Sequence, residues 1–289
     1  WGTNKIIIDS NGLNYQSEAD TYTVEYETDG QTVSIVYSGA TVGWIPESDV
    51  DVTDAPVVPP TQKGIFGFGN DGSGTSVTNL VNSSGVVATD TTGVGSARWD
   101  LGAAGYGYDK AIFAYGYITD YVSMSNLVSN SGVVATDVSG VGTSRSGSAA
   151  AGYGSTGQAI YGYGFTGSVT NISNLVSNAG VIATDTSGVG TARRNVAAAG
   201  YGTDNDKAIF AYGSTGSVTA VSNLVTNVGV IGTDVSGVGS ARADAAACSY
   251  GSTGQAIFGY GSTGSYTAVT NLVNSSGVVA SDVSGVGTT

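Results

Sequence analysis

Histidine is absent from this chain of 289 residues, and cysteine occurs once, at Cys248. Without histidine the chain cannot form the Ser-His-Asp or Cys-His groups of nucleophilic catalysis, or the common zinc and iron sites. A single cysteine cannot form an intrachain disulfide. Because Cys248 replaces an alanine of a repeated segment, we expect a small buried side chain there. The sequence therefore predicts a protein that has no metal and no cofactor and is not an enzyme.

Basic residues are also few, with 9 Lys and Arg against 22 Asp and Glu and a net charge of −13. Such an acidic surface repels the phosphates of nucleic acids and anionic lipids. No apolar run approaches the roughly 20 residues of a membrane-spanning helix, and no signal-peptide pattern opens the chain. We expect neither nucleic-acid binding nor membrane insertion. Since the first residue is Trp1 and not Met, we expect a processed product or part of a longer chain.

Proline is scarce, and three of the four prolines lie within residues 51–60. This clustering predicts a stiff, extended linker over residues 51–62. The preceding residues hold short β-forming segments joined by glycine turns, and two of them flank Asp29-Gly30, a dipeptide typical of a hairpin turn. We therefore predict a small antiparallel β-module over residues 1–50.

Glycine is abundant, with 46 residues, but it follows no Gly-X-Y period, which excludes collagen. The apolar residues are rich in Val, Ile and Tyr, which are typical of β-strands. One unit is written five times over residues 63–289, and each copy carries the tripeptide Asn-Leu-Val, which begins at Asn79, Asn126, Asn174, Asn223 and Asn271. The sequence predicts an all-β protein with a five-repeat domain over residues 63–289.

Each repeat contains four strand candidates, of the form AAAGYG, AIFGYG, SVTNLV and GVVATD, separated by turn residues. Such units predict a β-propeller, with a linear stack of β-sheets as the alternative. Strand alternation predicts that Phe113 and Tyr115 point to one face, and Ile112, Ala114 and Gly116 to the other. We expect the bulky face of one sheet to pack on the flat face of the next.

The order of segments resembles a kelch repeat, in which an arginine and small residues lead into a strand that ends in an aromatic-Gly pair. Here Tyr-Gly replaces the kelch double glycine, and the late tryptophan is absent. The segments AIFGYG, TNLVNSSGVVATD and GVGTAR, with QTVSIVYSGATVGWIP in the front module, resemble repeat-bearing virion proteins of marine tailed bacteriophages. This resemblance covers most of the chain. It implies a fibre, spike or capsid appendage located in the virion, outside cells. It also implies a homo-oligomer whose partners are other virion proteins and a host-surface glycan or receptor.

The first and last copies are incomplete in complementary ways. The first begins at GIFGFG, residues 64–69, so it lacks the strand that follows the arginine in the other copies, and the last ends after its fourth segment. We expect that about ten further residues would close five units into a propeller by completing one blade from both ends. Alternatively, one blade stays incomplete, or the N-terminal module lends it a strand.

One aspartate and one arginine recur at fixed positions of the repeat: Asp90, Asp137, Asp185, Asp234 and Asp282, and Arg98, Arg145, Arg193 and Arg242. The aspartates could form a ring that binds calcium or sugar, but Asp-x-Ser/Thr-Gly is itself a turn sequence, in which the carboxylate accepts backbone N–H groups of its own turn. The arginines could bind an acidic ligand, or pair with the aspartates and cap carbonyls within each unit. Their presence in nearly every copy favours structural roles.

Function is expected where the copies differ, because architecture explains the shared residues and loops carry function. The differences gather after each arginine and after each aromatic strand. The predicted ligand-binding residues are Trp99, Asp100, Tyr117, Asp120, Tyr121, Phe165, Arg194 and Asp244. Aromatic rings beside carboxylates suit a carbohydrate, through ring stacking and hydrogen bonds. Ordinary drift of loop sequences is the alternative.

These observations predict a phage virion protein, either a tail fibre or a capsid decoration protein, which acts by display and adhesion without catalysis. One alternative is a polysaccharide-degrading enzyme on a propeller, whose paired carboxylates would supply acid–base chemistry without histidine. Another is a bacterial extracellular filament or matrix protein built of repeated modules.

Overall fold

The computed structural model describes residues 6–17, 24–26, 33–47 and 63–288, and the chain divides into two compact units, residues 1–62 and 63–289. Every regular element of the described residues is a β-strand, so the prediction of an all-β protein is confirmed. No helix within these residues is long and apolar enough to cross a membrane.

In the N-terminal unit, the described residues form two small antiparallel sheets. Strands β1 (Ile6–Ile8) and β2 (Val24–Tyr26) form one, and β3 (Ile35–Tyr37) and β4 (Trp44–Pro46) form the other. The buried side chains of Tyr15, Val24 and Tyr26 form its core. The segments expected to form a hairpin around Asp29-Gly30 contribute β2 and β3, which lie in different sheets, so the hairpin pairing is not found among the described residues. Asp29-Gly30 itself and the predicted linker over 51–62 lie outside the described residues.

The second unit, hereafter the repeat unit, consists of five small antiparallel sheets in chain order. The first has two strands, β5 (Gly64–Asn70) and β6 (Gly74–Val81). Each of the others has three strands: β7 (Gly102–Tyr106), β8 (Lys110–Ala114) and β9 (Ser125–Val128); β10 (Ala149–Tyr153), β11 (Gln158–Phe165) and β12 (Val169–Val176); β13 (Ala197–Tyr201), β14 (Lys207–Ala211) and β15 (Ser222–Val225); β16 (Ala246–Tyr250), β17 (Gln255–Gly259) and β18 (Thr270–Val273).

The predicted fourth strand of each repeat is not continuous. In the second sheet it is held by isolated bridges from Val134 and Val138 to the two ends of β9. Between them, Asn126 of β9 donates its side-chain amide to the carbonyl of Ala135 and to the carboxylate of Asp137. A side chain thus replaces part of the backbone ladder, which is why four candidate segments give three strands and a bridged edge.

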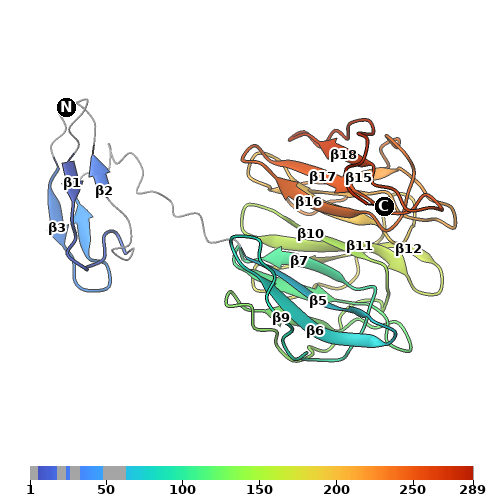
Figure 1. Cartoon of the computed structure of the whole chain (residues 1–289), viewed down its shortest axis with the longest axis horizontal. Coiled ribbons are helices and arrows are strands. Elements are labelled where there is room, and N and C mark those ends of the chain that lie inside the picture. Colours follow the sequence, from blue (N-terminus) through green and yellow to red (C-terminus); the bar gives the residue numbers. More distant parts are fainter. Residues whose placement is uncertain (1–5, 18–23, 27–32, 48–62, 289) are drawn as a thin grey trace. The chain divides into compact units, whose positions relative to one another are not determined.

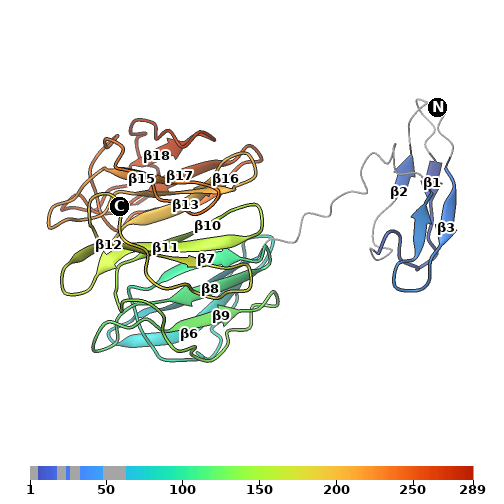
Figure 2. The same ribbon diagram turned by 180° about the vertical axis from the view of Figure 1, so that it is seen from behind.

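The sheets follow one another face to face, with β5 and β6 on one side of β10–β12 and β16–β18 on the other (Figures 1 and 2). The strands β7, β10, β13 and β16 lie side by side along one edge of the stack. This arrangement is compatible with a linear stack of sheets, the alternative architecture expected from the sequence. Closure of the stack into a propeller ring stays a prediction.

The prediction that Phe113 and Tyr115 share a face is wrong. Phe113 packs with Phe68 of the first sheet, whereas Tyr115 packs with Tyr161 of the third. The cause is the backbone of Tyr115, whose φ of 64° is left-handed and interrupts the alternation of a strand. The expected packing of a bulky face on a flat face is nevertheless present between the first two sheets. The Phe113 ring packs so closely on Gly67 that a Cβ added there would lie 3.1 Å from it.

Each interface between sheets contains a buried arginine stacked on an aromatic ring of the preceding sheet. The four pairs are Arg98–Phe68, Arg145–Tyr115, Arg193–Tyr163 and Arg242–Tyr212, with 3.8–4.3 Å between guanidinium carbon and ring centroid. All four arginine side chains are fully buried. Such desolvated cation–π contacts contribute on the order of 2 kcal/mol each, so the arginines hold neighbouring sheets together.

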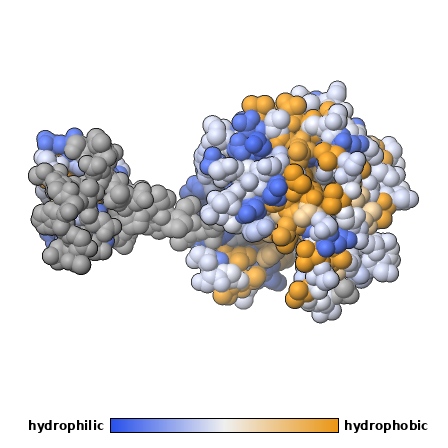
Figure 3. All heavy atoms as spheres, turned by 90° about the horizontal axis from the view of Figure 1, so that it is seen from above, coloured by the Kyte–Doolittle hydropathy of each residue, from blue (hydrophilic) through white to orange (hydrophobic). Residues whose placement is uncertain are grey.

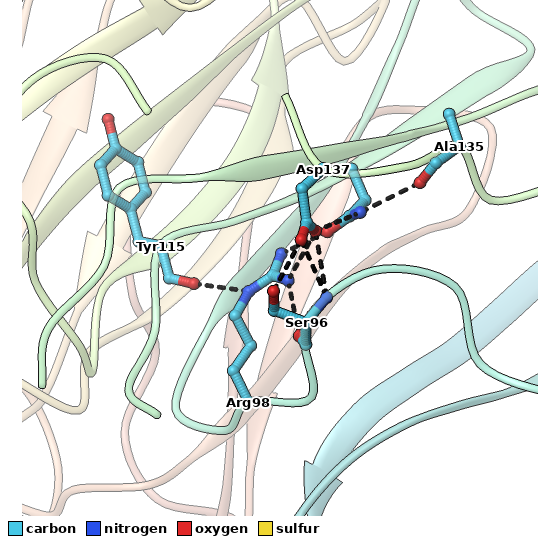
Figure 4. Close-up of polar contacts among 6 residues, drawn as sticks. Ser96, Arg98, Tyr115, Ala135 and Asp137 are labelled. Carbon is cyan, nitrogen blue, oxygen red and sulfur yellow. Dashed lines mark hydrogen bonds and ion pairs between the residues drawn. The ribbon is translucent and has the colours of Figure 1, made fainter. Parts of the chain in front are cut away.

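Arg98 also donates hydrogen bonds to the following sheet (Figure 4). Arg98 donates from Nε to the carbonyl of Tyr115 at 2.9 Å and from Nη2 to Oδ1 of Asn126 at 2.7 Å. Its Nη1 donates to the carbonyl of Ser96 and lies 3.9 Å from the Asp137 carboxylate. Carbonyl capping and aspartate pairing were both predicted, but the principal partner, Asn126, was not.

Four of the five repeated aspartates, all except Asp90, join neighbouring repeats rather than closing their own turns, which corrects the sequence interpretation. Asp185 accepts the backbone N–H and the hydroxyl of Thr143 from the preceding repeat, and the amide of Asn174 from its own. Asp137, Asp234 and Asp282 repeat this pattern. Burial alone would raise the pKa of Asp185, but these hydrogen bonds outweigh burial and hold its pKa below the ordinary value.

Acid is expected to weaken the stack through these aspartates. Because the folded-state pKa of Asp185 lies below its unfolded value, its contribution is complete above about pH 4 and is lost as the pH falls through the folded pKa. Urea unfolding should therefore show a lower midpoint at pH 3 than at pH 6. Thr143→Val, which removes one donor to Asp185, should move this loss to higher pH. An unchanged midpoint between the two pH values would contradict the assignment.

Candidate functional site

The candidate site begins two residues after each buried arginine. The residues at this position are Asp100, Gly147, Asn195 and Asp244, and all four have a left-handed backbone with φ between 53° and 59°. They are linked in series by backbone hydrogen bonds, in which Gly147, Asn195 and Asp244 each donate to the carbonyl of the preceding member. The repeat therefore places its variable residues side by side at one end of β7, β10, β13 and β16.

A cavity of about 260 Å³ opens at this place. Its lining consists of Asp100, Leu101, Gly147, Ser148, Asn195, Val196, Asp244 and Ala245. The amide of Asn195 donates to the carboxylate of Asp244. The cavity thus presents carboxylates, an amide and a hydroxyl beside small apolar groups, a mixture that suits a polar organic ligand.

The protonation of Asp100, and with it the charge of the cavity, depends on the surrounding groups. Burial raises the pKa of the Asp100 carboxyl, the negative charge of Asp244 raises it further, and Arg194 opposes both. Two carboxylates and one guanidinium therefore act on the same small volume. The guanidinium can donate hydrogen bonds to the hydroxyl groups of a ligand, and the carboxylates can accept hydrogen bonds from them.

A row of aromatic rings begins at Trp99, the chain neighbour of Asp100 in the cavity lining. Trp99 and Tyr117 have ring centroids 5.3 Å apart, Tyr117 and Tyr121 are 5.4 Å apart, and Tyr121 and Phe165 are 5.9 Å apart. The guanidinium of Arg194 covers the other end of the row, 4.6 Å from the Phe165 centroid. The four aromatic side chains are half-buried and Arg194 is exposed. The aromatic row therefore forms an apolar strip with charged groups at its end.

The structure brings the eight predicted ligand-binding residues into one region. Trp99 and Tyr117 face each other because a backbone bridge joins the loop after the arginine to the loop after the aromatic strand. Asp120 has a turn role, because its carboxylate accepts the backbone N–H of Tyr121. The sequence interpretation missed Asn195 and Gly147, although both stand at the same repeat position as Asp100 and Asp244 and could have been found by that equivalence.

No protein-family model and no curated protein matches the sequence. Among solved structures, the fold is similar to that of a fungal alcohol oxidase of the AA5 family, determined in complex with copper, with a TM-score of 0.50 and 13% identity. The similarity covers 80% of this chain and 64% of the oxidase chain, so this chain spans less than two thirds of the oxidase's length. At 13% identity the similarity concerns the β-rich fold alone.

Proposed function

We propose that this chain is a structural and adhesion protein of a tailed-phage virion, whose repeat unit binds a glycan of the host surface through the aromatic row and the adjoining cavity. The single observation that carries glycan binding is the continuous row of Trp99, Tyr117, Tyr121 and Phe165 beside the cavity of Asp100 and Asp244. Sugar rings stack on such faces while carboxylates and amides bind their hydroxyl groups. The virion assignment rests on the sequence resemblance described above.

The stack of repeats supports a role in display. Shared residues bury arginines and aromatic rings between sheets, so the scaffold stays constant while the loops vary. A protein of this design can present one specialised surface on a constant scaffold. Assembly with other virion proteins, and a homo-oligomeric state, belong to the same proposal.

Titration with purified surface polysaccharides and their oligosaccharides tests the proposal. Trp99→Ala and Tyr121→Ala are each expected to weaken binding about tenfold, since each removes one stacking surface. The matched control is Tyr266→Ala, because Tyr266 is the counterpart of Tyr121 in the last repeat, is 81% exposed and lies outside the row. Equal effects of all three changes, or no binding to any surface glycan, would contradict glycan recognition by the row.

The pair formed by Asp100 and Asp244 favours a second candidate function, a polysaccharide-degrading enzyme. A carboxyl with a raised pKa next to a second carboxylate is the arrangement of an acid and a base in glycoside hydrolysis. The two functions differ in the fate of the ligand. Adhesion leaves a bound polysaccharide at its original length, whereas an enzyme shortens it and loses this activity with Asp100→Asn.

A further inference from the structure

Among the described residues, the first sheet has no counterpart of the strand that completes each of the other sheets. In the second sheet, β7 pairs along the whole of β8, from Gly102 opposite Ala114 to Tyr106 opposite Lys110. In the first sheet, β5 is the counterpart of β8 and pairs with β6 alone. The backbone groups on the other side of β5 have no strand partner among the described residues. An unpaired strand edge of this kind is a template for a further strand.

Two side chains of the first sheet also lack the partners of their counterparts. The carboxylate of Asp137 accepts hydrogen bonds from the backbone N–H and the hydroxyl of Ser96, and Oδ1 of Asn126 accepts one from the guanidinium of Arg98. The corresponding residues of the first sheet are Asp90 and Asn79, which bond to each other. Within the described part of the chain no serine, threonine or arginine reaches them. The missing strand and the missing donors therefore lie at one place.

The apolar surface beside this edge is uncovered too. Phe66 stands at the position of Phe113, Tyr161, Phe210 and Phe258, which are all buried against the preceding sheet. Phe66 itself is 63% exposed. In the second, third and fourth sheets, one segment supplies both absent polar contacts: a serine or threonine, then an arginine two residues later, then a strand of small residues.

The opposite end of the stack is uncovered as well (Figure 3). The view of Figure 3 is from the side on which β16–β18 lie in Figure 1, and hydrophobic residues gather there. Tyr260 is 46% exposed, although its counterparts Tyr115, Tyr163 and Tyr212 are buried. Cys248 is exposed for the same reason, which corrects the expectation of a buried side chain.

A second copy of this chain would match this surface only in part. It could place its Tyr260 end against Phe66, since both are exposed aromatic residues. It would leave the edge of β5 unpaired, and its four arginines are buried in its own interfaces. An additional strand satisfies more of the open groups than a second copy does.

We propose that β5, Asp90 and Asn79 form an acceptor site for a β-strand from a partner polypeptide. The recognised segment carries Ser or Thr, an arginine two residues later, and then small side chains that pair antiparallel with β5 over Gly64–Gly67. Asp90 binds the hydroxyl and N–H of the first residue, and Asn79 binds the guanidinium. The site is an assembly surface that is separate from the aromatic row.

A synthetic peptide with the sequence of residues 191–201 tests the site, because it contains Thr191, Arg193 and the strand β13 (Ala197–Tyr201). Fluorescence anisotropy of the labelled peptide with the whole chain should show saturable binding with a Kd below about 100 µM. The peptide with Arg193→Ala should bind at least about tenfold more weakly, since it loses a charge-assisted hydrogen bond. A peptide with proline at both 198 and 199 should not bind, because proline cannot pair in a strand.

Protein variants locate the binding. Asp90→Ala is expected to weaken it at least about tenfold, and Asp204→Ala, an exposed carboxylate elsewhere, serves as the matched control. The proposal is overturned if the peptide does not bind at about 1 mM, or if Asp90→Ala and Asp204→Ala bind it equally. Sedimentation that shows a dimer dissociated by Phe66→Ala, with no peptide binding, would assign the surface to a second copy instead.

Discussion

Arg193→Ala is expected to lower the free energy of unfolding of the repeat unit by about 3–5 kcal/mol. The side chain is fully buried and fills the interface between the third and fourth sheets. Nε donates to the carbonyl of Tyr212, Nη1 to that of Thr191 and Nη2 to Oδ1 of Asn223. Alanine would leave an internal cavity and remove the guanidinium from all three acceptors. Both consequences are costly inside a packed interface.

The neighbouring residue provides the control for this experiment. Arg194 is exposed and stacks on Phe165 at the surface, so Arg194→Ala should change the free energy of unfolding by less than about 0.5 kcal/mol. The same change is expected to weaken glycan binding, because Arg194 covers the end of the aromatic row. Urea unfolding followed by tyrosine fluorescence measures the difference. Equal destabilisation by the two alanine variants would contradict the role of Arg193.

Arg193→Lys should recover only part of the loss. Lysine keeps the charge, but its single ammonium group cannot reach the carbonyl of Tyr212 and Oδ1 of Asn223 in the fixed geometry of a guanidinium, and it stacks less well on Tyr163. Because each sheet contacts only its neighbours, loss at one interface can also uncouple the sheets on its two sides. A broader unfolding transition for the variant would be the sign of this uncoupling.

The structural role of the arginines could be inferred from the sequence, because a residue that recurs in every interface serves architecture. The acceptor Asn126 and its equivalents could not, since Asn-Leu-Val has the pattern of an ordinary strand. Only the three-dimensional arrangement shows that this asparagine lies opposite the interrupted fourth segment. The face of Tyr115 was mispredicted because strand alternation assumes a regular backbone, and the left-handed conformation of this non-glycine residue breaks it.

The candidate site was more accessible to sequence reasoning than the packing was. Residues at one repeat position must lie in equivalent places, so the differences among Asp100, Gly147, Asn195 and Asp244 mark a single region of the stack. What the sequence does not contain is the bridge between Trp99 and Tyr117, which joins two loops into one aromatic row. That juxtaposition depends on backbone hydrogen bonds between loops, and these have no sequence signature.

The second large effect is expected from Gly190→Ala, which should lower the free energy of unfolding by about 3 kcal/mol. Gly190 has φ of 76°, a conformation that costs an alanine about 1 kcal/mol. In addition, a Cβ would lie 2.3 Å from Oδ1 of Asp234 and 2.5 Å from Nδ2 of Asn223. These two groups hold Thr191 and Arg193, so they cannot move without loss of the hydrogen bonds between the repeats.

Gly85→Ala separates the two contributions. Gly85 has nearly the same φ, 77°, but a Cβ there would meet nothing within 4 Å. This variant should therefore show the backbone cost alone, about 1 kcal/mol, and the difference of about 2 kcal/mol between the variants would measure the disturbed contacts of Asp234 and Asn223. Urea unfolding of both proteins at pH 7 supplies the comparison. If the two variants are equally stable, the glycine at 190 is required by its backbone conformation alone, and the connection between repeats tolerates displacement of its aspartate.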